Sequence, residues 1–232
     1  TPASTYYVKQ DGSLWALGAN HYGQLGIGHT NYVTSPVQVV SSGVVDVEAG
    51  DVRAFFIKED GSLWAFGNNT HGQLGDGSTE NRDTPVKVVD SDVVAAFAVG
   101  PYASGSSFFI KTDGSLWAFG DNTHGELGDG TTEDRHTPVK VVDDGVVAVA
   151  TGYSHTLFLK EDGSVWAMGL NNHRQFGDGT NQNRNSPLKV LDGDVIALAA
   201  GYRHSQIVKT DGSLWSVGRN NNGELGDGTL EN

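Results

Sequence analysis

The chain has 232 residues, with 32 glycines, no cysteine and a hydrophobic content of 37%. Its formal net charge of −13 repels polyanions, so we expect neither nucleic acid nor an anionic membrane as a partner. The lack of cysteine removes disulfides, thiol catalysis and thiolate metal sites. No apolar stretch approaches the roughly 20 residues that cross a bilayer. Five Trp, seven Tyr and nine Phe supply the apolar area of a packed core.

A repeat organises the whole chain. The segment Asp-Gly-Ser-Leu/Val-Trp starts at Asp11, Asp60, Asp113, Asp162 and Asp211. The repeat units span residues 1–50, 51–100, 101–152, 153–201 and 202–232, and we treat 1–232 as one domain or a fragment of one. A period of about 50 residues is typical of propeller blades.

Each repeat predicts four short strands, which the second repeat illustrates in chain order. A small-residue strand, Val44–Ala49, precedes Ala54–Lys58. The Asp-Gly pair predicts a type I′ hairpin turn into a Trp strand at 62–66. After a Gly/Asn loop comes Pro85–Val89, and because proline is tolerated at the start of an edge strand, we place this strand outermost.

Four antiparallel strands per repeat predict an all-β propeller of about five four-stranded blades. By count, the first and last blades are incomplete, since the chain opens on a second strand and stops before a last fourth strand. One tryptophan per blade at a fixed register predicts that these indoles fill the core between blades. They are Trp15, Trp64, Trp117, Trp166 and Trp215.

The run Leu63–Gly77 and the trailing Thr84–Val88 resemble the RCC1-type repeat (regulator of chromosome condensation) in a bacterial style, with copies throughout the chain. The resemblance implies a ring that acts as a protein-binding platform; some family members are exchange factors for a small GTPase. A closed ring of seven repeats would need roughly 350 residues. We therefore expect a fragment of a longer array, or an open set whose strand edges invite self-association.

Catalytic and cofactor chemistry is not expected. Gly72–Gly77 lacks the order and the following helix of a phosphate loop, so its glycines predict tight turns. Asp76 and its equivalents lack the clustered oxygens that calcium requires. The histidines lack zinc-site spacing, and every candidate serine has copies in other repeats. We predict no enzyme, no metal and no cofactor. Asn68 begins a glycosylation sequon, Asn-Asn-Thr.

The repeats differ mainly in two loops, which antiparallel order places at one end of each blade. These loops carry tyrosine, arginine and histidine, whereas the other end collects aspartates. Because tyrosine and arginine are enriched at interface hot spots, we predict a partner-binding face. Its candidate residues are Tyr22, Arg53, Tyr102, Tyr153, His155, Arg174, Tyr202, Arg203 and Arg219.

We therefore predict a non-catalytic module that presents this face to another protein. One alternative is a structural fragment that completes its blades by oligomerisation, and another is a carbohydrate-binding propeller. The compartment is not written in the sequence, although the bacterial style slightly favours an extracellular or cell-surface location.

Overall fold

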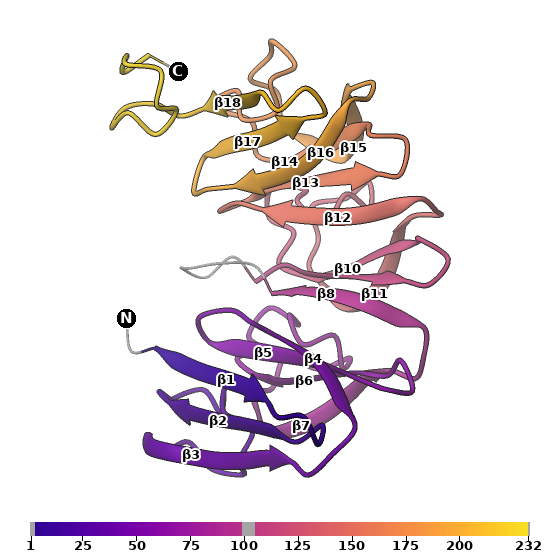
Figure 1. The fold of residues 1–232 in the computed structure, drawn as a ribbon, viewed down its shortest axis with the longest axis vertical. Coiled ribbons are helices and arrows are strands. Elements are labelled where there is room, and N and C mark those ends of the chain that lie inside the picture. Colours follow the sequence, from indigo (N-terminus) through magenta and orange to yellow (C-terminus); the bar gives the residue numbers. More distant parts are fainter. Residues whose placement is uncertain (1–2, 99–104, 232) are drawn as a thin grey trace. The chain divides into compact units, whose positions relative to one another are not determined.

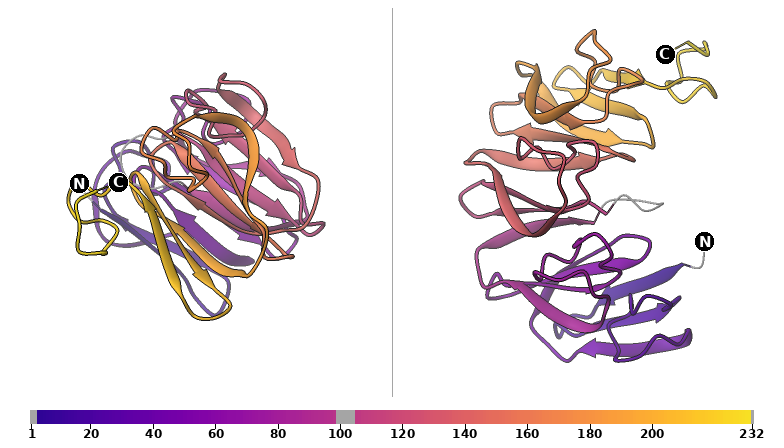
Figure 2. Two further views of the ribbon diagram at one scale, coloured as in Figure 1. Left: turned by 90° about the horizontal axis from the view of Figure 1, so that it is seen from above. Right: turned by 180° about the vertical axis from the view of Figure 1, so that it is seen from behind.

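The computed structural model describes residues 3–98 and 105–231. Within these residues the chain forms five sheets built from strands that follow one another in the sequence (Figure 1). The first and last sheets have three strands and the other three have four, which confirms incomplete first and last blades. Figure 2 shows the same strands from two further sides. Among the described residues there is no helix that could cross a membrane.

The first sheet consists of β1 (Ser4–Val8), β2 (Leu14–Gly18) and β3 (Val33–Val40). The second consists of β4 (Val44–Ala49), β5 (Arg53–Lys58), β6 (Leu63–Gly67) and β7 (Arg82–Val89). The third consists of β8 (Val93–Ala98), β9 (Ser107–Lys111), β10 (Leu116–Gly120) and β11 (Arg135–Val142). The fourth consists of β12 (Val146–Thr151), β13 (His155–Lys160), β14 (Val165–Gly169) and β15 (Arg184–Leu191). The fifth consists of β16 (Val195–Ala200), β17 (His204–Lys209) and β18 (Leu214–Gly218).

The chain divides into two compact units. The first contains the first two sheets with strands β8 and β9, and the second contains the fourth and fifth sheets with residues 121–133.

The fourth strand of each complete sheet lies at its edge, as the proline pattern predicts. The strand nevertheless begins before the proline: β7 starts at Arg82, so Pro85 is an interior residue, and the predicted start at proline is wrong. The register between β6 and β7 shifts between Ala65 and Gly67. Proline lacks a backbone N–H, and an edge strand tolerates it because one side of the strand has no neighbouring strand to receive a hydrogen bond.

The Asp-Gly hairpins are not type I′. Gly12 has a φ of 75°, whereas Asp11 is not among the residues with positive φ. The amide of Gly12 donates to the carbonyl of Lys9 at 2.9 Å, and the amide of Lys9 donates to the carbonyl of Ser13 at 2.9 Å. This pattern is a three-residue connection that ends in a left-handed glycine, which is the next most common hairpin form.

Phenylalanine and leucine, rather than tryptophan, fill the space between neighbouring sheets. In the first unit, one buried cluster joins Leu14 of the first sheet to Phe56 and Phe66 of the second. Trp64 packs against this cluster but stays partly exposed. Trp215 is 56% exposed. The prediction that all five indoles are core residues is therefore wrong for Trp215 and only partly right elsewhere.

The Asp-Gly-Ser-Leu-Trp segment instead holds each indole in place through hydrogen bonds. Asp60 Oδ1 accepts hydrogen bonds from the amide of Ser62 at 2.9 Å and from its hydroxyl at 2.6 Å. The same hydroxyl accepts the indole N–H of Trp64 at 2.9 Å. The indole then stacks on Phe56, with ring centroids 6.0 Å apart and an interplanar angle of 6°.

Close backbone approach makes one glycine of the second sheet irreplaceable. Gly67 has a φ of 110°, and a Cβ atom there would lie 2.4 Å from the Val52 carbonyl oxygen and 2.6 Å from the Arg53 Cα. Gly43, in the same unit, has a φ of 77° but nothing within 4 Å of the corresponding position.

We expect Gly67→Ala to lower the free energy of unfolding by about 3 kcal/mol or more, since it adds a backbone clash to left-handed strain. Gly43→Ala, the matched control, adds only the strain, about 1 kcal/mol. Urea unfolding of both variants measures the difference, and equal losses would contradict the packing described here.

Candidate functional site

Two tyrosines meet on the loops that follow the inner strands of the fourth and fifth sheets. Tyr153 comes after β12 and Tyr202 after β16. The amide of Tyr153 donates to the carbonyl of Tyr202 at 3.0 Å, and their ring centroids lie 4.5 Å apart. Tyr202 is 45% exposed. Tyr153 is half-buried, so the second unit presents a partly exposed aromatic pair from two loops that are 49 residues apart in the sequence.

Arg203 completes this feature. Its guanidinium carbon lies 5.9 Å from the ring centroid of Tyr153 and 5.4 Å from that of Tyr202. Its Nη1 donates to Nε2 of His173 at 3.0 Å. We call Tyr153, Tyr202 and Arg203 the tyrosine–arginine patch. A cation held over aromatic rings is pre-organised, so less side-chain entropy is lost when it pairs with an acidic group.

His173 keeps the patch in this arrangement as a neutral imidazole. Desolvation, followed by the charges of Arg203 and Arg219, lowers the pKa of His173. Because Arg203 is always a donor, the Nε2 atom of His173 accepts the hydrogen bond and carries no proton. His173 was not among the predicted site residues, although its neighbour Arg174 was. Histidine recurs at this loop position in other repeats, so nothing in the sequence indicates that this one contacts Arg203.

The other candidate arginines of the second unit lie around this patch with different roles. Arg219 donates its amide to the carbonyl of Arg203 at 2.9 Å, and its Nε lies 3.6 Å from Glu224 Oε1. Arg174 is exposed and adopts a left-handed backbone with a φ of 61°, which tightens its loop. Arg219 therefore adjoins the patch through the main chain, while Arg174 is a loop residue open to solvent.

Arg53 and His155 are buried rather than exposed on the predicted face. Arg53 is only 3% exposed; its Nη2 donates to the Ser106 carbonyl at 2.7 Å and its Nε to Ser107 Oγ at 3.2 Å. His155 is 1% exposed, and its Nε2 lies 3.1 Å from Ser205 Oγ. Both were predicted to meet a partner, and both instead tie one sheet to the next, because the strand begins one residue earlier than the sequence indicates.

Two further tyrosines, Tyr22 and Tyr102, are among the candidate residues. Tyr22 is exposed on a loop of the first unit, where its amide donates to Gln24 Oε1 at 2.9 Å. Tyr102 lies outside the described residues.

The aspartates of the Gly-rich loops serve their own turns. Asp76 Oδ1 accepts from the Ser78 amide at 3.0 Å and from Asn69 Nδ2 at 3.1 Å, and Asp76 Oδ2 accepts from Arg82 Nε at 2.6 Å. These bonds agree with the turn interpretation of the motif. The sequon asparagine, Asn68, is only 8% exposed, and its Oδ1 accepts hydrogen bonds from Thr70 and Gln73.

The fold and these loops define a class of protein first: an all-β repeat protein whose sheets match propeller blades. The family model described as the regulator of chromosome condensation (RCC1) repeat matches residues 11–56, 60–105, 113–159 and 162–208. These matches cover most of the sequence, and the chain belongs to the RCC1 repeat family. No curated protein sequence matches the chain.

Solved structures confirm the fold. Human WBSCR16 superposes with a TM-score of 0.80 at 22% identity, over 99% of this chain and 63% of its own. The structure of Kap60 bound to yeast RCC1 (Prp20) matches with a TM-score of 0.79 at 19% identity, over 99% of this chain and 57% of the other. Prp20p from Saccharomyces cerevisiae gives a TM-score of 0.75 at 20% identity, over 99% of this chain and 59% of its own. The chain thus spans roughly 60% of the length of these propellers.

His155 predicts a dependence of stability on pH. Burial, together with the charge of His204, lowers the pKa of His155 from 6.5 to about 4. Between these values the unfolded chain binds a proton that the folded chain excludes, so stability falls as the pH drops from 6.5 to 4, by up to about 3 kcal/mol. Above pH 7 the effect disappears, because His155 is then neutral in both states.

Denaturation of the wild type and His155→Gln at several pH values measures this effect. The variant should lose most of the decline between pH 6.5 and 4.5. His21→Gln, which removes an exposed histidine of the first unit, is the control and should keep the decline. An unchanged pH profile in His155→Gln would show that the imidazole is solvated.

Proposed function

We propose that the chain is a non-catalytic protein-interaction module and that the tyrosine–arginine patch is its main contact with a partner protein. The observation that supports this most is the packing of Arg203 over Tyr153 and Tyr202 on adjacent, exposed loops. Tyrosine and arginine are among the residues most enriched at interface hot spots, whereas unconstrained surface loops favour small polar residues.

The family supports the same proposal. Yeast RCC1 (Prp20) is seen bound to Kap60, and Prp20p is described by its binding properties to Gsp1p and histones. A uniform scaffold that varies in its loops suits such binding, because the scaffold fixes the loops while their side chains set the specificity. Arg203 is then the group that pairs with a carboxylate on the partner.

We expect Tyr202→Ala to weaken partner binding by about 30-fold or more, the effect of losing one aromatic anchor of about 2 kcal/mol. Proteins retained by the immobilised chain are identified by mass spectrometry, and the affinity of each purified candidate is then measured by calorimetry. Tyr32→Ala is the control, since Tyr32 is also an exposed tyrosine but lies outside the patch.

A partner that binds Tyr202→Ala and the wild type equally, while Tyr32→Ala weakens it, would place the interface elsewhere. The melting temperature of both variants should stay within a few degrees of the wild type, because neither ring is a core residue.

Two other functions remain as predictions with distinct measurements. A self-associating structural fragment requires a stable oligomer at micromolar concentration, which native mass spectrometry detects. A carbohydrate-binding propeller requires saturable binding on a glycan array that Tyr202→Ala abolishes.

A further inference from the structure

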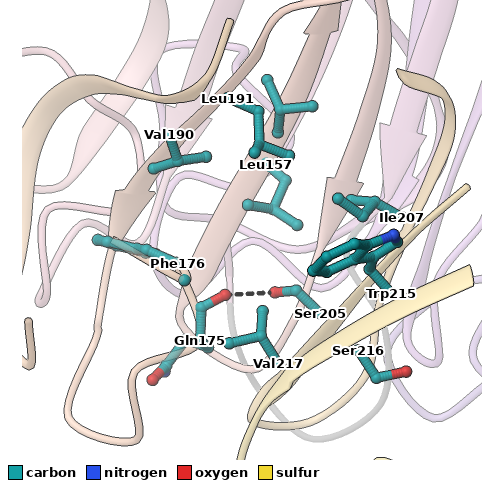
Figure 3. A pocket seen from close by; sticks show the side chains of 12 residues that line it. Leu157, Gln175, Phe176, Val190, Leu191, Ser205, Ile207, Trp215, Ser216 and Val217 are labelled. Atoms are coloured by element: carbon teal, nitrogen blue, oxygen red, sulfur yellow. Dashed lines mark hydrogen bonds between the residues drawn. The ribbon is translucent and has the colours of Figure 1, made fainter. Parts of the chain in front are cut away.

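The second unit contains a pocket between the fourth and fifth sheets, with a volume of about 320 Å³ (Figure 3). Phe176 and Trp215 stand on opposite sides of it, with Leu157 and Leu191 along one end and Val217 towards the other. Uncharged residues make up its whole lining. The tyrosine–arginine patch contributes no residue to it.

Beside this pocket, the fifth repeat lacks a phenyl ring that three other repeats have. In three sheets a phenylalanine stacks on the blade tryptophan, as Phe158 does on Trp166 with ring centroids 6.1 Å apart and an interplanar angle of 6°. The equivalent pairs Phe56–Trp64 and Phe109–Trp117 lie at 6.0 Å and 5.9 Å. In the fifth sheet, the residue paired with Trp215 is Ile207. The indole of Trp215 therefore lacks the stacked ring that these equivalents have.

A second truncation adjoins the first. Two residues after the tryptophan, the preceding repeats carry large side chains that press against a loop glycine. The Cβ position of Gly75 lies 2.8 Å from the ring of Phe119, and that of Gly128 lies 2.2 Å from the sulfur of Met168. At the corresponding place Gly177 faces Val217 at 3.5 Å, so the fifth repeat leaves room there.

The loop residue Phe176 only partly makes up for these losses. It takes the place of Leu74 and Leu127 in the preceding repeats and forms the aromatic wall opposite Trp215. The result is a cavity with two aromatic sides and aliphatic ends. Such a space favours a flat ring, because an offset or tilted aromatic contact adds to the gain from burying apolar area.

We propose that this pocket binds a small, uncharged molecule carrying one aromatic ring, which takes the place of the phenyl groups that the fifth repeat lacks. Its volume is at the lower end of small-molecule sites. Charged ligands are disfavoured, since the lining offers no ion pair to offset their desolvation. The ammonium of Lys209 already lies 4.5 Å from the indole centroid of Trp215, which further disfavours a cation.

The ligand has a route to its site because Trp215 is 56% exposed. A bound ring would cover the indole face and remove apolar surface from water, which is the main driving force for binding here. The inference concerns a different surface from the proposed partner contact, so either can fail without the other.

The experiment uses benzyl alcohol as the uncharged probe, with benzoate and benzylammonium as its charged counterparts. In nuclear magnetic resonance titrations of the full chain, benzyl alcohol should shift the indole N–H signal of Trp215 and the methyl signals of Ile207 and Val217. The shifts should saturate with a Kd on the order of 1 mM. Both charged probes should bind at least tenfold more weakly.

Refilling the pocket provides the variant test. Ile207→Phe combined with Val217→Phe restores the residues found at Phe56 and Phe66, and should weaken benzyl alcohol binding at least tenfold. Val217→Met, the milder change that copies Met168, should weaken it severalfold and serves if the double variant does not fold. Leu214→Ala is the matched control, because Leu214 lies next to Trp215 in β18 on the opposite face and is 63% exposed.

Several results would overturn the proposal. They are the absence of saturable shifts at Trp215 in the wild type, equal binding of benzoate, and unchanged binding in the refilled variants. A peptide with the sequence of residues 184–191 that binds this pocket while benzyl alcohol does not would also overturn it, since the space would then receive a strand and not a free ring.

Discussion

A buried hydroxyl at the start of a strand joins the second sheet to β9 in the first unit and the fourth sheet to the fifth in the second unit, and the placement of the residues just before these strands depends on this bond. Ser107 Oγ donates to the Gln73 carbonyl at 2.9 Å and accepts from Arg53 Nε. In the second unit, Ser205 Oγ donates to the Gln175 carbonyl at 2.7 Å and meets Nε2 of His155. These sheets carry apolar side chains on both faces, so each sheet must pack against another to bury them. The hydroxyl then fixes the position of the adjacent sheet.

This constraint separates residues that are buried at the sheet junctions from residues that reach solvent. Arg53 and His155 occupy the register that faces the hydroxyl, and they are buried at their sheet junctions. Tyr153, Tyr202 and Arg203 lie one or two residues before that register, beyond the end of the ladder, where side chains reach solvent. A shift of one residue along the chain therefore decides whether a side chain is buried between two sheets or reaches solvent.

The sequence predicted most of the fold because the repeat shows each strand several times. The inner strand Val44–Ala49 has the expected bounds. The burial of Arg53 could not be predicted, since its partners lie 53 and 54 residues away and arginine is usually a surface residue. The exposed Trp215 was missed for a similar reason: the motif is constant, whereas its burial depends on the side chains packed around it. Tyr153 and Tyr202 were both predicted as site residues, but the contact between their rings was not predicted.

The most direct test of the junction is a double-mutant cycle with Arg53→Met, Ser107→Ala and the combined variant, each measured by urea unfolding. A charged, buried hydrogen bond predicts a coupling free energy of about 1.5 kcal/mol or more between the two side chains. A coupling near zero would mean that Arg53 does not bind this hydroxyl, and the account of how neighbouring sheets are held together would be contradicted.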